Sequence, residues 1–114
     1  PVQQALAEYL QEPQHYLGLN DFYQEKRDFF LNALKDSRFT ITPSQGTYFQ
    51  LLGYSNITNE GDVDFAKRLI VDHQLASIPI SVFNIAEKDN KVLRFCFAKT
   101  QETLEKAIVI LNRL

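Results

Sequence analysis

The stretch of residues 92–99, which reads V-L-R-F-C-F-A-K, constrains the fold of this chain more than any other part of the sequence. Leu93, Phe95 and Phe97 occupy alternate positions, the period of two that is typical of a β-strand with two distinct faces. Because almost every other residue here is apolar as well, we expect both faces to be covered. Arg94 is the exception, since a guanidinium keeps its charge and needs an anionic partner or water.

Two partners for Arg94 follow from this requirement. The first is a structural ion pair with a carboxylate of the same chain, for which Glu87 and Asp89 are close in sequence. The second is the carboxylate of a bound substrate, which would make Arg94 the functional residue of the domain. Sequence pattern alone leaves both possibilities open.

Composition indicates one compact domain with an ample core. The chain has 114 residues, 45% of them hydrophobic, and a domain of this size buries roughly two thirds of its unfolded surface. A net charge of −2 gives no reason to expect a nucleic acid or an anionic membrane as partner. The single cysteine, Cys96, excludes an internal disulfide and fits a reducing, cytoplasmic setting. No apolar run reaches the roughly 20 residues of a membrane span.

The N-terminal part of the sequence lacks the usual start signals. There is no methionine, and the first residues already have helical spacing, so we expect an excised or truncated piece of a longer protein. A helix is predicted over residues 2–11, ended by Pro13. Residues 17–21 then form a junction suited to a hinge or a domain boundary.

The remaining elements predict an α+β fold. Three more helices are expected, with N-caps at Asn20 or Asp21, at Asp62 and at Thr100. Strands are expected over residues 39–42, 47–52 and 92–99. Residues 76–83 are expected to be extended and to include a short strand, and Pro79 implies an edge position or an irregular segment there. This order predicts a two-layer sandwich, a small and mostly antiparallel sheet backed by helices on one face. The face that carries Arg94 should then lack a cover within this chain.

The common catalytic and cofactor motifs are missing. Four scattered glycines cannot form a phosphate-binding loop, and His15 and His73 have no metal-ligand spacing with Cys96. A cysteine in a core strand usually behaves as a small hydrophobic residue, so Cys96 is not predicted to be a nucleophile. Residue types and spacing therefore predict an α+β domain with one functionally suspicious arginine.

Four segments together resemble a known family in the right order. They are P-V-Q-Q-A-L-A at residues 1–7, G-T-Y-F at 46–49, A-S-I-P-I-S-V-F at 76–83 and L-R-F-C-F-A-K at 93–99. The chain resembles the C-terminal part of fold-type I, class I/II pyridoxal-phosphate-dependent aminotransferases of the kynurenine/methionine aminotransferase kind. The resemblance implies that residues 1–16 are the helix at the junction with a large domain, and residues 17–114 the small domain.

The resemblance also implies roles for individual residues. In this family the arginine of the last motif binds the α-carboxylate of the amino-acid or 2-oxo-acid substrate, which carries over to Arg94. Gly46 would allow close backbone approach, and Tyr48, Phe49 and Phe83 would border the substrate channel. A planar guanidinium suits the role because it makes two parallel hydrogen bonds to a carboxylate.

The resemblance places the reaction centre elsewhere. The lysine that forms a Schiff base with pyridoxal 5'-phosphate lies upstream in the large domain of these enzymes, and none of the seven lysines here matches its setting. We therefore expect this chain alone neither to bind the cofactor nor to transaminate, and the parent enzyme to be a homodimer acting on methionine or an aromatic amino acid. The alternatives are a free-standing module that binds a small acid and a protein-interaction domain.

Overall fold

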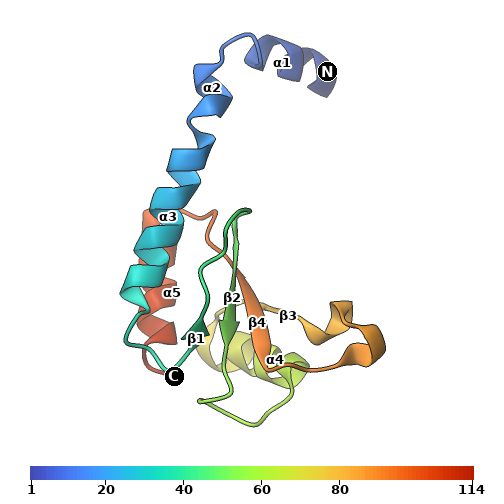
Figure 1. The fold of residues 1–114 in the computed structure, drawn as a ribbon, viewed down its shortest axis with the longest axis vertical. Coiled ribbons are helices and arrows are strands. Elements are labelled where there is room, and N and C mark those ends of the chain that lie inside the picture. The colour runs from blue at the N-terminus through green and yellow to red at the C-terminus, as the bar shows by residue number, and fades with distance from the viewer.

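The structure, a computed structural model, describes residues 1–114 (Figure 1). The helices are α1 (Val2–Tyr9), α2 (Gln14–Leu17), α3 (Leu19–Ala33), α4 (Asp62–His73) and α5 (Gln101–Leu111), with two 3-10 turns, η1 (Ser81–Phe83) and η2 (Ile85–Glu87). The strands are β1 (Thr40–Ile41), β2 (Phe49–Gly53), β3 (Ile78–Pro79) and β4 (Val92–Cys96). They form one antiparallel sheet in the order β1-β2-β4-β3. The predicted α+β class, with its small antiparallel sheet, is confirmed.

The covered face of the sheet holds the core. Leu93 and Phe95 of β4, Leu52 of β2 and Phe97 just beyond β4 are all buried. They share one cluster with buried side chains of three helices and their ends: Phe30 of α3 and Leu34 at its C-cap, Phe65, Ala66 and Leu69 of α4, and Leu104, Ile108 and Leu111 of α5. The period of two in β4 thus separates a helix-covered face from an open one, as its sequence predicts.

The open face carries the residues that alternate with this core. Arg94 lies at the centre of β4, opposite Leu51 of β2 and Ile78 of β3 in the sheet register. Both of these apolar neighbours are exposed, and no helix of the chain covers them. An exposed apolar patch around a charged residue is unusual for a surface that faces only water.

The N-terminal helices lie away from the sheet. Figure 1 shows α1 and α2 extending beyond the sheet and its helices, along the longest axis of the molecule. The whole chain measures 50 Å along this axis, and neither helix contains a buried residue. Gly18, between α2 and α3, has helical dihedral angles, so the two helices meet with a single residue between them. The domain boundary between residues 16 and 17 stays a prediction. No helix of the structure is both long and apolar enough to cross a membrane.

One predicted helix cap differs from the structure at α3, and another is confirmed at α5. Helix α3 begins at Leu19 with Gly18 as N-cap, so neither Asn20 nor Asp21 caps it. The expected capping by Thr100 is confirmed, because its hydroxyl oxygen accepts a hydrogen bond from the Thr103 backbone N–H at 3.3 Å. The Thr100 cap involves residues only three apart, so it can be predicted from sequence. The start of α3 instead depends on how the chain before Gly18 folds, because α2 runs directly into α3.

The prediction that Asp62 caps α4 is wrong. Gly61 is the N-cap, and the Asp62 side chain instead accepts hydrogen bonds from Ser81, 19 residues further along the chain. The segment predicted to be extended over residues 76–83 holds a short strand and an irregular continuation. Only Ile78–Pro79 pairs with the sheet, at the predicted edge, and the chain then turns into η1.

Candidate functional site

Two aromatic rings hold the guanidinium of Arg94 on the open face. Its Cζ lies 4.2 Å from the centroid of the Phe49 ring on β2 and 5.3 Å from the centroid of the Phe83 ring in η1. Such cation–π contacts attract the cation while leaving its N–H groups free to donate. The structure thus brings together Arg94, Phe49 and Phe83, three site residues that were predicted from the sequence. They come from β4, β2 and the turn after β3.

Arg94 has no anionic partner within the chain. The structure contains five ion pairs, and none includes Arg94. Asp89, one of the two alternative partners, contacts the Nζ of Lys91 at 3.1 Å instead, and Glu87 forms no ion pair. The Nε of Arg94 is buried and donates to no acceptor. A buried donor without an acceptor costs about 1–3 kcal/mol, so the ion-pair explanation does not account for this residue.

The other partly buried arginines show what satisfied guanidinium groups look like in this fold. Arg68 contacts Glu60 at 2.7 Å, and that hydrogen bond lowers the pKa of the Glu60 carboxyl. Arg27 contacts Asp28 at 2.7 Å and also donates to the backbone oxygen of Ser44. Arg94 is therefore distinctive in being partly buried, in cation–π contact with two rings and unpaired.

A polar cluster fixes the start of the Arg94 strand. Asp89 accepts hydrogen bonds from the backbone N–H of Lys91 at 2.7 Å and from that of Asp62 at 3.1 Å. Burial disfavours the Asp89 carboxylate, but these bonds and the Lys91 ammonium outweigh it, so the pKa of Asp89 is lowered. The pKa of the Tyr54 hydroxyl is raised, mainly because the side chain is buried and also because the carboxylates of Asp89, Asp62 and Glu60 lie nearby. Chain entry into β4 is thereby tied to α4.

Gly46 and Tyr48 lie in the turn that precedes β2. Both line a cavity of about 430 Å³ that also includes Tyr23 and Arg27, and Arg94 is not among its lining residues. Tyr48 reaches the site through Phe49, since their ring centroids are 4.5 Å apart. A Cβ at Gly46 would meet no atom of this chain within 4 Å. The roles proposed for Gly46 and Tyr48 remain predictions.

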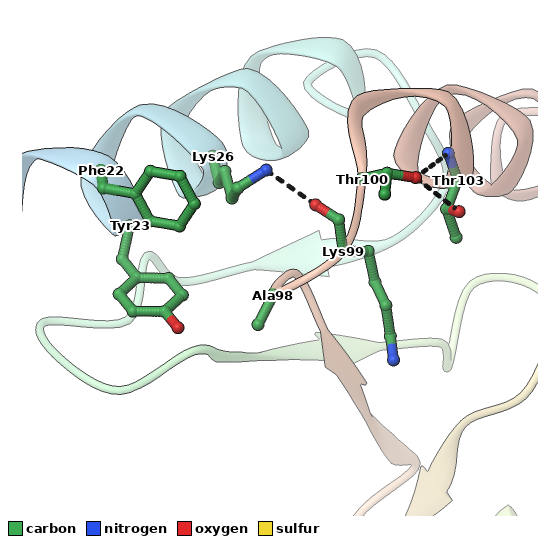
Figure 2. A pocket seen from close by; sticks show the side chains of 7 residues that line it. All are labelled: Phe22, Tyr23, Lys26, Ala98, Lys99, Thr100 and Thr103. Atoms are coloured by element: carbon green, nitrogen blue, oxygen red, sulfur yellow. Dashed lines mark hydrogen bonds between the residues drawn. The ribbon is translucent and has the colours of Figure 1, made fainter. Parts of the chain in front are cut away.

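A cavity of about 540 Å³ lies between α3 and the start of α5 (Figure 2), and Arg94 is not among its lining residues. Lys26 donates from Nζ to the backbone oxygen of Lys99 at 2.7 Å, and its ammonium also lies over the Phe22 ring. Thr100 and Thr103, which are joined by the capping hydrogen bond of α5, also line the cavity. These contacts join α3 to the β4–α5 connection.

The residues around Arg94 do not fit the cofactor. Its neighbours Leu51, Ile78, Phe49 and Phe83 are all apolar, so they supply neither an amine for a Schiff base nor a cluster of N–H donors for a phosphate. One cation on an apolar face matches a carboxylate attached to an apolar group. The site is thus suited to one end of an amphipathic organic acid.

The comparisons with known proteins define the class. The model of the "Aminotransferase class I and II" family matches residues 1–111, and the chain belongs to this family. The resemblance inferred from the four sequence motifs is thereby confirmed.

Within this family, the chain is similar to methionine and kynurenine aminotransferases. The chain is 47% identical to the methionine aminotransferase of Escherichia coli over its whole length and 30% of that protein. A crystal structure of an E. coli methionine aminotransferase superposes with a TM-score of 0.91, over 98% of this chain and 30% of that one. The kynurenine–oxoglutarate transaminase of Dictyostelium discoideum is 30% identical over 94% of the chain and 30% of the relative. The chain thus spans about three tenths of the length of the curated relatives it matches.

Proposed function

We propose that this chain is the substrate-binding small domain of a pyridoxal-phosphate-dependent aminotransferase, and that Arg94 binds the α-carboxylate of its substrates. The parent enzyme transfers an amino group between an amino acid and a 2-oxo acid. The observation that carries the proposal is the unpaired guanidinium of Arg94, in contact with the rings of Phe49 and Phe83 on an otherwise apolar face. Both substrates of a transaminase share the α-carboxylate, so one clamp serves both half-reactions.

The geometry favours binding through the two terminal amino groups of Arg94. Nε is buried, whereas the terminal nitrogens are neither buried without a partner nor hydrogen bonded. Two parallel N–H···O bonds to one carboxylate fix its plane as well as its position. The rings of Phe49 and Phe83 restrict the guanidinium before the substrate arrives, which reduces the entropy lost on binding. Arg94 thereby orients the substrate and leaves proton transfer to other groups.

The cofactor chemistry belongs to the part of the protein outside this chain. Pyridoxal phosphate, when bound there, would supply the carbonyl group that accepts the amino group. We propose that this part also covers the open sheet face around Leu51 and Ile78, which are exposed here. By analogy with its family the enzyme is expected to be a homodimer, and we propose a cytoplasmic location, with which the one cysteine of this chain is compatible.

The preferred amino acid has a large apolar side chain. Leu51, Ile78, Phe49 and Phe83 surround Arg94 with apolar surface, and none offers a charge to a polar side chain. The similarity to a methionine aminotransferase and to a kynurenine transaminase supports methionine or an aromatic amino acid as substrate. Methionine fits an irregular apolar surface because its side chain is unbranched and flexible.

The test uses the full-length protein and compares Arg94→Gln with Arg113→Gln. Arg113 is a matched control because it is exposed, forms no ion pair and loses the same charge. Activity is measured with methionine and with the amine that lacks its carboxylate. Loss of two charge-assisted hydrogen bonds costs about 3–5 kcal/mol, so kcat/KM for methionine should fall by about 100-fold or more in Arg94→Gln.

The carboxylate-free amine separates a clamp from a general defect. Since this amine makes no bond to Arg94, its low activity should change little in Arg94→Gln, and the preference for methionine over the amine should collapse. Arg113→Gln should match the unmodified protein with both substrates. Equal losses with methionine and with the amine would assign Arg94 to folding and overturn the proposal.

A further inference from the structure

The segment that carries Phe83 has almost no contact with the core. It connects β3 to β4, and after Ser81 no residue up to Lys88 is buried. Phe83 is 64% exposed and Ile85 is 96% exposed, so their apolar side chains do not hold the segment in place. Ser81, at 6% exposure, is its buried anchor.

Asp62 holds this anchor from the first turn of α4. Its Oδ2 accepts a hydrogen bond from the Ser81 backbone N–H and its Oδ1 accepts one from the Ser81 hydroxyl, both at 2.7 Å. Asp62 itself is 2% exposed. Two short bonds, one to each carboxylate oxygen, fix the orientation of Ser81 as well as its position. The helix N-terminus also stabilises the buried negative charge.

The backbone beyond Ser81 is held in an unfavourable conformation. Ala86 and Glu87 have φ angles of 55° and 51°, the left-handed region that residues with a Cβ rarely adopt. Such a segment relaxes when its anchor is removed, and strained backbone of this kind clusters where function needs a fixed geometry. The fixed geometry here is the contact of the Phe83 ring with the Arg94 guanidinium, at 5.3 Å.

We propose that Asp62 is a positioning residue for the substrate-binding site: through Ser81 it fixes the η1 turn and so holds Phe83 against Arg94. This inference rests on the proposed role of Arg94. Asp62 touches neither Arg94 nor Phe83 through a hydrogen bond, and its effect on substrate binding is transmitted by one residue. A buried aspartate at a helix start thus serves the binding site rather than its own helix.

The test measures KM and kcat for methionine in the full-length protein with Asp62→Asn and Ser81→Ala. Asparagine keeps only one acceptor oxygen, so it can accept only one of the two hydrogen bonds that Ser81 donates to Asp62, and it lacks the carboxylate charge. Ser81→Ala removes only the hydroxyl bond and keeps the N–H bond to Asp62. We expect KM to rise about tenfold in Asp62→Asn and by less in Ser81→Ala, with kcat within about threefold.

Asp64→Asn is the matched control, because Asp64 lies in the same helical turn, is exposed and has no ion pair. It should leave KM unchanged. A KM that stays constant in folded Asp62→Asn, or rises equally in Asp64→Asn, would overturn the inference. If Asp62→Asn fails to fold, Ser81→Ala decides in the same way: a rise in KM supports the inference and a constant KM overturns it.

A double-mutant cycle with Phe83→Ala identifies the route of the effect. If Asp62 acts by placing Phe83, then Asp62→Asn should raise KM by less than about twofold once Phe83 is already alanine. Fully additive effects would show that Asp62 acts another way. Arg94→Gln, measured in parallel, separates the two proposals: an unchanged KM there contradicts the carboxylate clamp itself. A raised KM in Arg94→Gln with none in Asp62→Asn contradicts only the positioning role.

Discussion

Two leucines on opposite faces of the sheet provide a quantitative test of the fold. Leu93 on β4 is 0% exposed and belongs to the core cluster. Leu51 on β2 lies opposite Arg94 on the other face of the sheet and is 46% exposed. Both lie in central strands, so Leu→Ala carries the same loss of β-propensity at each position. The difference between the two variants therefore reports burial.

The expected magnitudes follow from these environments. Leu93→Ala loses the transfer free energy of a fully buried side chain and leaves a cavity, for a total of about 3–4 kcal/mol. Leu51→Ala should lower the free energy of unfolding by less than about 1 kcal/mol, because half of its side chain is already in water. With a urea dependence of about 1.5 kcal/mol per M, the midpoint should fall by roughly 2–3 M for Leu93→Ala.

The assay is urea-induced unfolding of the 114-residue chain, followed by far-UV circular dichroism. Equal losses at the two positions would contradict the separation of a covered face from an open one. A larger loss in Leu51→Ala than in Leu93→Ala would mean that the faces are reversed, and that Arg94 points into the helical layer.

Three further predictions concern the cap, the polar cluster and the cofactor. Thr100→Ala should lower the free energy of unfolding by about 1 kcal/mol, because the N–H of Thr103 loses its acceptor; an unchanged urea midpoint would contradict this. Asp89 has a pKa lowered below its ordinary 3.8, so its contribution to stability is present above that pH and is lost as the pH falls through the lowered value. Asp89→Asn should therefore be less stable than the unmodified chain at pH 7, with the gap closing in acid, whereas a gap that widens in acid would refute the assignment. Finally, pyridoxal phosphate added to the 114-residue chain should produce no more Schiff-base absorbance than free lysine at the same amine concentration, and a stoichiometric band above that level would show a reaction centre here.

Local patterns in the sequence were enough to predict the strand with Arg94 and the cap at Thr100. The alternation of Leu93 and Phe95 with Arg94 records which face is buried, since burial of one face imposes a period of two. Likewise, the capping bond of Thr100 spans only three residues. Information of this kind lies within one element and can be read without knowing the fold.

Contacts between distant segments could not be predicted in the same way. Asp62 has the residue type and position of an N-cap, yet it bonds to Ser81 because the turn after β3 comes to lie against the start of α4. The unpaired state of Arg94 is also a property of the assembled fold, since Asp89 was available by sequence but is bound to Lys91 and Asp62. The acidic residue at the helix start and the serine in I-P-I-S-V-F were visible signals, but nothing in the sequence joined them.

The most direct measurement is a crystal structure of the full-length protein with a non-reactive methionine analogue that retains the α-carboxylate. We expect both carboxylate oxygens to lie about 2.7–2.9 Å from the terminal nitrogens of Arg94, with the Phe49 and Phe83 rings still in contact with the guanidinium. An analogue bound with its carboxylate elsewhere, and Arg94 paired to a carboxylate of the protein itself, would contradict it.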